Sequence, residues 1–283
     1  MAEGKPDLVK HSLTADVVNG DVSQTAPVLK KEYIASHDDR MINTILLLVA
    51  MEAEASPLIH SLGLKLDDPP AILPPAPCLS YSGECFGAAI HLVCFGKCKS
   101  YGVDNVGTVP AALTTYLAIQ AFKPDMVIST GTAGGFRSKG AQIADVFVST
   151  SMANHDRRIP LPGFDKYGIG AHSAVPTPNL QRELGLKAGV VTSGNSLDYT
   201  TEDMALMVEN GAAVKEMEAA AVAWAADLFG APVFCIKSVT DIVDGDRPAS
   251  EEFLENLHRA AEALQATVPR VLEFIAGKKL SEL

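Results

Sequence analysis

The chain has 283 residues, of which 47% are hydrophobic and 20% are charged. This length suits one large α/β domain or two small ones, and the apolar content is enough for a large core, which excludes a wholly disordered chain. Acidic residues outnumber basic residues by 34 to 23, which gives a formal net charge of −11. Because a negative chain repels nucleic acid and anionic membrane surfaces, we expect neither as a partner. The composition leaves a small-molecule substrate open.

The cysteines and the apolar runs indicate the cellular compartment in which the protein is expected. The five cysteines are odd in number and include no C-x-x-C pair, so we expect reduced thiols and a reducing compartment. Residues 1–13 lack the apolar run of a secretory signal, and the longest apolar run, 45–51, is too short to span a bilayer. We therefore expect a cytoplasmic protein. The cysteines are Cys78, Cys85, Cys94, Cys98 and Cys235.

The pattern of residues divides the chain into a mobile N-terminal tail, residues 1–40, and a single domain, residues 41–283. The tail has scattered charges and turn-forming residues but no sustained hydrophobic period. The domain opens with a continuous apolar run at 44–50, which is typical of a strand covered on both faces. A short helix is expected at 54–62, and the five prolines of 69–77 predict a loop.

Strands and helices alternate along the rest of the domain. Residues 79–83 and 89–95 predict a hairpin, and the apolar spacing of 104–122 predicts a helix. Pro269 should kink or divide the last helix. The alternation favours an α/β domain with helices around a mostly parallel or mixed sheet. The further strands are expected at 126–130, 145–150, 188–193 and 232–239, and the further helices at 217–229 and 250–276.

Four segments place acids or glycines where predicted strands end. Ligands of open α/β sheets bind at the carboxyl ends of strands, so these residues are candidates for a functional site. If their acids converge, two carboxylates on opposite sides of a glycosidic bond could divide the work of acid and base. The segments are Ala50-Met51-Glu52-Ala53-Glu54, Thr130-Gly131-Thr132-Ala133-Gly134-Gly135, Val214-Lys215-Glu216-Met217-Glu218 and Lys237-Ser238-Val239-Thr240-Asp241.

Each segment also has a purely structural explanation, and the spacing alone does not choose between the two. Acids in the first turn of a helix complement the helix dipole, which would explain Glu54 and Glu218. The glycines could form a turn, and Asp241 could be an N-cap or turn residue. The glycine segment matches neither the dinucleotide-binding pattern nor the P-loop pattern, and His155 has no second histidine at ligand spacing. A metal site is therefore not expected.

The four segments occur in the order that one family shows. The chain resembles the 5′-methylthioadenosine/S-adenosylhomocysteine nucleosidases of the nucleoside phosphorylase superfamily, and it looks most like the plant 5′-methylthioadenosine nucleosidases. The similarity runs from about residue 43 to the C-terminus. Further support comes from Val106-Gly107-Thr108-Val109-Pro110-Ala111, His155-Asp156-Arg157-Arg158-Ile159-Pro160, Asp244-Gly245-Asp246 and Lys279-Leu280-Ser281-Glu282-Leu283.

The resemblance implies a three-layer α/β/α sandwich around a mixed, mostly parallel sheet, which works as a homodimer without a cofactor or metal. It also implies roles for the strand-end residues. Asp241 would protonate N7 of adenine, with Thr240 beside it, and Glu54 would activate the attacking water. Glu218, with Met217, would hold the ribose hydroxyls. An aspartic acid that donates a proton at neutral pH needs a raised pKa, so we expect Asp241 to be buried.

Other residues are implied to shape the substrate pocket. Thr132, Ala133 and Gly134 would lie close to the water and the ribose. Leu197 and Asp198 would flank the adenine. The 5′-alkylthio group would contact three residues of the neighbouring subunit, namely Ile159, Leu161 and Phe164.

The sequence departs from the family beside the purine. Relatives commonly have Asp where this chain has Asn195, and plant relatives have Met where it has Tyr199. The segment 95–101 also differs, because it carries Lys97 and Lys99 where relatives have small apolar residues.

The resemblance predicts an N-glycosyl hydrolase that converts 5′-methylthioadenosine to adenine and 5-methylthioribose in methionine salvage. It leaves S-adenosylhomocysteine open as a second substrate. Two alternatives share the fold. A phosphorylase would use phosphate in place of water, for which Lys97, Lys99 and the glycine segment are candidate ligands. A storage or binding protein would hold a nucleoside without turnover.

Overall fold

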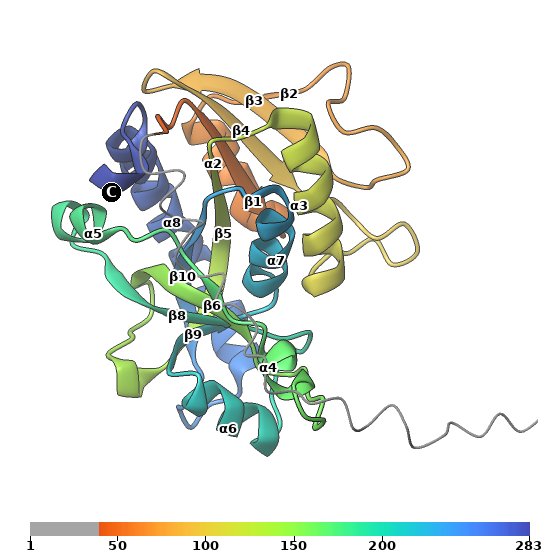
Figure 1. Cartoon of the computed structure of the whole chain (residues 1–283), viewed down its shortest axis with the longest axis vertical. Helices are drawn as coiled ribbons and strands as arrows, with labels where there is room; N and C mark the ends of the chain where they lie inside the picture. The colour runs from red at the N-terminus through yellow and green to blue at the C-terminus, as the bar shows by residue number, and fades with distance from the viewer. Residues whose placement is uncertain (1–39) are drawn as a thin grey trace, which may run out of the picture.

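The computed structural model describes residues 40–283, and all of the expected N-terminal tail except residue 40 lies outside the described residues. A ten-stranded mixed sheet runs through this part, with helices on both faces (Figure 1). The strands are β1 (Thr44–Val49), β2 (Lys65–Leu66), β3 (Leu79–Cys85), β4 (Ala88–Cys94), β5 (Met126–Gly135), β6 (Val146–Asn154), β7 (His172–Ser173), β8 (Lys187–Ser193), β9 (Ala212–Glu216) and β10 (Val233–Ile242). The helices are α2 (Glu52–Ser61), α3 (Thr108–Phe122), α4 (Phe164–Ile169), α5 (Pro178–Leu184), α6 (Thr201–Glu209), α7 (Ala219–Phe229) and α8 (Ala249–Ile275), with 3-10 turns at Arg137–Lys139 and Leu280–Glu282.

The sheet combines a closed part and an open part. Its order is β10-β6-β8-β9-β5-β1-β4-β3-β2, with β7 beside β6. Because β10 also pairs with β5, the strands β5, β10, β6, β8 and β9 form a closed circuit. The long central pairings, such as β1 with β4 and β5 with β10, are parallel, whereas β3 and β4 form an antiparallel hairpin. The expected mixed, mostly parallel sheet is confirmed, and the parallel strands β1, β5 and β10 all end at the same edge.

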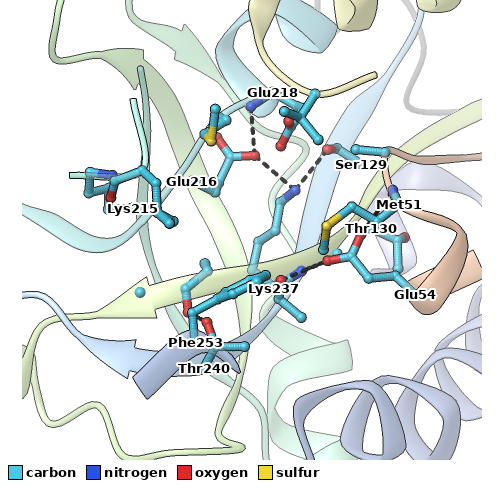
Figure 2. A pocket seen from close by; sticks show the side chains of 18 of the residues that line it. Met51, Glu54, Ser129, Thr130, Lys215, Glu216, Glu218, Lys237, Thr240 and Phe253 are labelled. Atoms are coloured by element: carbon cyan, nitrogen blue, oxygen red, sulfur yellow. Dashed lines mark hydrogen bonds and ion pairs between the residues drawn. The ribbon is translucent and has the colours of Figure 1, made fainter. Parts of the chain in front are cut away.

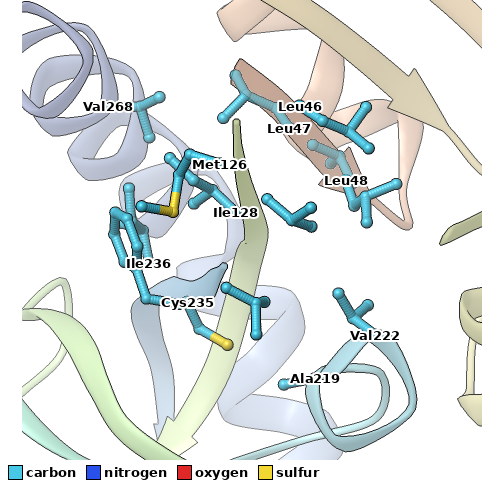
Figure 3. Close-up of a cluster of buried hydrophobic side chains, with 14 of the residues drawn as sticks. Leu46, Leu47, Leu48, Met126, Ile128, Ala219, Val222, Cys235, Ile236 and Val268 are labelled. Carbon is cyan, nitrogen blue, oxygen red and sulfur yellow. The ribbon is translucent and has the colours of Figure 1, made fainter. Parts of the chain in front are cut away.

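The core lies where the central strands pass between two pairs of helices. Helix α3 packs against α7, and α2 packs against α8. Figure 3 shows Val268 of α8 and Val222 of α7 on either side of β1, β5 and β10. Leu47, Met126 and Ile236, one from each of these strands, are wholly buried. A strand covered on both faces has no solvated side, which is why β1 reads TILLLV without polar alternation.

The glycine segment is a strand and not a turn, which corrects one of the two explanations left open. Strand β5 continues to Gly135 because residues 131–135 pair with residues 237–242 of β10. Strand β10 in turn extends to Ile242, beyond its expected end. Helix α3 starts at Thr108, later than expected, because Gly107 precedes it with φ of 96°, a left-handed conformation that suits glycine.

Two further differences concern helices. Helix α8 runs unbroken from Ala249 to Ile275, so the expected division at Pro269 is wrong. A proline inside a helix costs about 3 kcal/mol, and the fully buried row of Leu264, Val268 and Leu272 offsets that cost. Helices α4, α5 and α6 are not predicted from the sequence. Helix α6 had a readable signal, because Thr200 caps it and Asp203 completes a capping box.

The structure also bears on the cysteines and on membrane-spanning segments. All five cysteines are free, and Cys78, Cys94 and Cys235 are buried. Among residues 40–283, no helix has the length and apolar character needed to cross a membrane.

Candidate active site

A cavity of about 270 Å³ opens at the carboxyl ends of β1, β5, β9 and β10. Figure 2 shows Glu54, Glu216, Glu218 and Lys237 converging around it from different elements. The segments expected at strand ends therefore do meet in one place. Nine of the predicted site residues line the cavity: Glu54, Thr132, Ala133, Gly134, Leu197, Met217, Glu218, Thr240 and Asp241.

Glu54 stands in the first turn of α2 and is buried. Its Oε1 accepts hydrogen bonds from the Thr132 N–H at 2.8 Å and the Thr132 hydroxyl at 2.7 Å. The carboxylate lies against Gly131, where an added Cβ would come within 3.1 Å of Oε2. Burial raises the pKa of Glu54, and the hydrogen bonds from Thr132 oppose this rise. Glu54 is thus a helix-start acid that also faces the cavity.

Asp241 lies near the end of β10 and is buried, as expected. Its Oδ2 would lie 2.6 Å from a Cβ at Gly134, so a side chain there would displace the carboxyl group. The Thr240 hydroxyl lies 2.7 Å from Oδ1 of Asp241 and 3.3 Å from the carbonyl oxygen of Ala133. Burial raises the pKa of Asp241, against the Thr240 hydrogen bond and the Lys215 ammonium.

The Thr240 hydroxyl also shows how a neutral Asp241 is accommodated. A hydroxyl carries one proton and can donate it to one acceptor at a time. When Thr240 donates to the carbonyl of Ala133, the protonated carboxyl group of Asp241 can donate to the Thr240 oxygen. Both the charged and the neutral form of Asp241 therefore have a hydrogen-bonding partner, which suits an acid that gains and loses a proton.

Glu218 precedes α7 and is half-buried. It is the N-cap residue of α7, but its side chain makes no capping hydrogen bond to this helix. Its Oε1 accepts a hydrogen bond from the Gly107 N–H at 2.8 Å. Burial and the neighbouring negative charge of Glu216 raise the pKa of Glu218 to about 7. The carboxyl group keeps acceptor positions that can serve a ligand.

Glu216 and Lys237 form a buried ion pair in the cavity wall that was not among the predicted site residues. The Lys237 Nζ lies 2.9 Å from Oε2 of Glu216, and both side chains are 2% exposed. Glu216 also accepts the N–H groups of Glu218 and Ala219, so it provides the acid at the start of α7. Burial alone would raise the pKa of Glu216, but the attraction of Lys237 and a hydrogen bond from Ser193 hold it below its ordinary value. A lysine in the middle of the apolar run 232–239 was the signal in the sequence.

The segment 195–199 contributes Leu197 to the cavity, and Lys215 and Tyr199 are among the side chains that hold it. The Lys215 ammonium donates to the carbonyl oxygens of Ser196 at 2.9 Å and Leu197 at 2.8 Å. The Tyr199 hydroxyl donates to the carbonyl oxygen of Val243 at 2.7 Å. The departure noted at Tyr199 therefore ties this segment to the chain just beyond Asp241.

Four predicted site residues do not line the cavity of this chain. Asp198 is exposed beside Leu197. The residues predicted for the 5′ group lie between β6 and α4 or at the start of α4, and they too stay outside the cavity. Those three residues are Ile159, Leu161 and Phe164.

Lys97 and Lys99, the cations considered for phosphate, also lie outside the cavity. Lys97 forms an exposed ion pair with Glu52 at 2.7 Å, and Lys99 is exposed. Within residues 40–283, no group of His, Cys, Asp and Glu side chains is arranged to hold a metal ion.

Fold and site together define the class. Acids with raised pKa values at the strand ends of an α/β sheet indicate a site for proton-transfer chemistry on a small molecule. The model of the phosphorylase superfamily matches residues 44–273, and the chain belongs to this superfamily. Within it, the relatives described next place the chain among the 5′-methylthioadenosine/S-adenosylhomocysteine nucleosidases.

Two curated relatives from Arabidopsis thaliana match most of the chain. The 5′-methylthioadenosine nucleosidase is 47% identical over 86% of this chain and 91% of its own length. The 5′-methylthioadenosine/S-adenosylhomocysteine nucleosidase is 48% identical over 87% of this chain and 97% of its own length. A solved structure of the Arabidopsis thaliana 5′-methylthioadenosine nucleosidase in apo form has a TM-score of 0.84 to this chain, at 47% identity, and covers 86% of this chain and 100% of that one.

Replacing Lys237 with methionine should destabilise the protein, because it leaves Glu216 buried without a counter-charge. Breaking a buried ion pair in this way costs roughly 3–5 kcal/mol. The double variant Glu216→Gln/Lys237→Met should recover much of the loss, because neither charge remains. Chemical denaturation measures the free energy of unfolding of the single and the double variant. Lys97→Met, which breaks an exposed pair, is the control and should leave the midpoint unchanged. Equal losses in the single and double variants would contradict this account.

Proposed function

We propose that the protein hydrolyses the N-glycosidic bond of 5′-methylthioadenosine to give adenine and 5-methylthioribose. The observation that carries the proposal is the meeting in one cavity of Asp241 from β10, Glu54 from α2 and Glu218 from the connection between β9 and α7. The names of the two Arabidopsis thaliana relatives support this substrate. We place the reaction in methionine salvage in the cytoplasm, where five free thiols suit the reducing conditions.

In the proposed reaction, Asp241 is the general acid. Its raised pKa lets it hold a proton, which it gives to N7 of adenine while the bond from C1′ to N9 breaks. The electron pair of that bond leaves with the adenine, and the proton on N7 neutralises the charge that would otherwise develop. Thr240 keeps the carboxyl group oriented in both protonation states. General acid catalysis of this kind contributes about 10²–10⁴-fold to a rate.

Glu54 and Glu218 act on the sugar. Glu54, fixed by its two bonds from Thr132, takes a proton from the water whose oxygen bonds to C1′. Glu218 accepts hydrogen bonds from the two ribose hydroxyls. Both carboxylates stabilise the positive charge that develops on the ribose in the transition state. Of the other predicted residues, Ala133, Gly134 and Met217 border the ribose, and Leu197 and Asp198 flank the adenine.

Water is favoured over phosphate as the nucleophile by the charges around the cavity. The cations that line it are Lys215 and Lys237. Lys237 is paired with Glu216, and Lys215 is bonded to two backbone carbonyls. A phosphate dianion would also meet the Glu54 carboxylate at close range and be repelled. The intact set of acids likewise favours an enzyme over a storage protein.

The direct test is incubation with 5′-methylthioadenosine in phosphate-free buffer, followed by chromatography of the products. We expect adenine and 5-methylthioribose, and Asp241→Asn should lower kcat by about 10²–10⁴-fold because the general acid is lost. S-adenosylhomocysteine is assayed in parallel to compare kcat/KM. A sugar 1-phosphate that forms only with added phosphate, or binding without any turnover, would overturn the proposal.

Substrate affinity should fall as the pH falls through about 7. The pKa of Glu218 is raised to about 7 by burial and by Glu216 on β9, with Glu54 on α2 raising it further and Lys237 on β10 lowering it. Below that pH the protonated carboxyl group accepts hydrogen bonds poorly. If only the ionised form binds, a drop from pH 8 to pH 6 should weaken binding by about tenfold.

The inactive Asp241→Asn variant allows this binding to be measured without turnover, by calorimetry with 5′-methylthioadenosine. Adding Glu218→Gln should abolish the pH dependence, because the titrating group is gone. A pH dependence that persists in the double variant would assign the effect to another group.

We also propose a homodimer in which the partner copy completes the 5′ pocket. Exposed apolar side chains gather on α3 and α7, two helices that pack against each other. Leu161 and Phe164, more than half exposed, lie outside the cavity of their own chain. A two-fold related copy uses the same surface on both chains, which would let these residues reach the cavity of the partner. The apolar residues are Val109, Leu113, Tyr116, Trp224, Leu228 and Phe229.

Light scattering coupled to size exclusion should give twice the chain mass of 29.9 kDa. Trp224→Glu, which places a charge on the apolar face of α7, should shift the protein to monomer and raise KM for 5′-methylthioadenosine. Leu73→Glu, an equal change at another exposed apolar residue, is the control and should remain dimeric. A monomeric wild-type protein with full activity would contradict the proposal.

A further inference from the structure

Strand β10 is irregular at the residue before Asp241. Its pairing with β5 shifts register between Val239 and Asp241, so Thr240 is an extra residue that forms a β-bulge. Consecutive side chains of a regular strand point to opposite faces of the sheet, yet Thr240 and Asp241 both line the cavity. Their side chains are in contact, with the Thr240 hydroxyl 2.7 Å from Oδ1 of Asp241. The bulge therefore lets two consecutive residues face one site.

Side chains of α8 complete the backbone hydrogen bonds of this bulge. On the side away from β5, β10 pairs with β6 at residues 236–238. Beyond these residues, α8 provides the partners. The Asn256 side-chain NH₂ donates to the carbonyl oxygen of Thr240 at 3.0 Å, and Oε2 of Glu252 accepts the N–H of Ile242 at 2.9 Å. The two neighbours of the catalytic acid are thus each bonded to one side chain of α8.

Glu252 and Asn256 are well placed for this contact. They are related as i and i+4 in α8, so they lie on the same face of the helix. The Asn256 NH₂ also donates to the carbonyl oxygen of Glu252 at 2.8 Å, so both amide hydrogens have partners. Phe253, between them, lines the cavity (Figure 2). An acid in the first turn complements the helix dipole, but Glu251 also does this and is exposed, whereas the side chain of Glu252 is only 13% exposed.

We propose that Glu252 and Asn256 are positioning residues for the general acid, which hold the backbone on both sides of Asp241 and keep its carboxyl group aimed at the cavity. This inference rests on the proposed function, in which Asp241 gives a proton to adenine. The carboxyl group already lies close against Gly134 of β5, so the strand end is fixed between β5 and α8. A displacement of a catalytic group by about 1 Å can cost about 10²-fold in rate.

The negative charge of Glu252 has a second effect on Asp241. Glu252 raises the pKa of Asp241, in addition to burial, whereas Lys215 of β9 lowers it. Arg247, 3.8 Å from Oε1 of Glu252, partly offsets the charge of Glu252. A general acid must be protonated, so kcat should fall as the pH rises through the pKa of Asp241. Without the charge of Glu252 that pKa is lower, and the fall should occur at lower pH.

The test compares Glu252→Ala with Glu252→Gln in steady-state kinetics with 5′-methylthioadenosine. Glu252→Ala removes the acceptor for the Ile242 N–H and should lower kcat by about tenfold or more. KM should change by less than about twofold, because the groups that bind the substrate remain. Asn256→Leu, which removes the donor to Thr240, should have the same effect.

Glu252→Gln separates the hydrogen bond from the charge. Its side chain keeps an oxygen that can accept from Ile242, so kcat at the pH optimum should stay within about threefold of the wild-type value. The alkaline limb of the pH profile of kcat should move to lower pH, because the negative charge is lost. A role in folding alone would not produce this shift.

Glu251→Ala is the matched control, because it removes an exposed carboxylate from the same turn of α8, and it should leave kcat and KM unchanged. The melting temperature of each variant separates a loss of folded protein from a loss of kcat. The inference is overturned by wild-type kcat in Glu252→Ala and Asn256→Leu, or by a Glu252→Gln variant as impaired as Glu252→Ala. Absence of turnover by the wild-type protein would instead overturn the proposed function, so the two failures are distinguishable.

Discussion

Two glycines in β5 decide how closely the acids of the site can gather. The Asp241 carboxyl group lies against Gly134, where a Cβ would come within 2.6 Å, and the Glu54 carboxylate lies against Gly131, where a Cβ would come within 3.1 Å, so a side chain at either position would displace the carboxyl group. Glycine inside a strand costs roughly 0.5–1 kcal/mol relative to alanine, and here pairing with β10 along the whole segment keeps the backbone extended. One strand can therefore carry two reacting groups beside its backbone, one from α2 and one from β10, and fix both without flexible loops.

Carboxylates gathered in a small cavity repel one another, and the ion pair of Lys237 and Glu216 influences which of them are ionised. The ammonium keeps Glu216 ionised, and the charge of Glu216 helps raise the pKa of Glu218. Asp241 lies farther along β10, and burial raises its pKa, so that it retains a proton more readily. The carboxyl groups of one cavity thus differ in how readily they hold a proton, because the pKa of Glu216 is lowered and the pKa values of Glu54, Glu218 and Asp241 are raised.

The sequence allowed the strand ends to be predicted, because an apolar run followed by an acid is a local pattern. Glu54 and Asp241 were found in this way, and the order of the motifs indicated the family. Contacts between distant strands have no such local pattern. Nothing in the neighbourhood of Lys237 shows that it pairs with Glu216 across the sheet, and the glycines of β5 look like a turn until their pairing with β10 is known. Ile159, Leu161 and Phe164 were placed by resemblance alone, and they lie outside the cavity of their own chain.

Within residues 40–283, the closed circuit of strands also limits edge-to-edge strand pairing between copies of the protein. Each strand of the circuit has a neighbour on both sides, so none offers a free row of backbone N–H and C=O groups. The open end of the sheet is at β3 and the two-residue strand β2, which pairs with Tyr81 and Ser82, while the neighbouring Asp67 N–H donates to the carbonyl oxygen of Ser80. Leu64 lies against Gly83 of β3, and the charged side chain of Glu84, next in the strand, is a poor template for adding a strand. The same topology that fixes the acids thus gives the folded protein little tendency to aggregate through its strand edges.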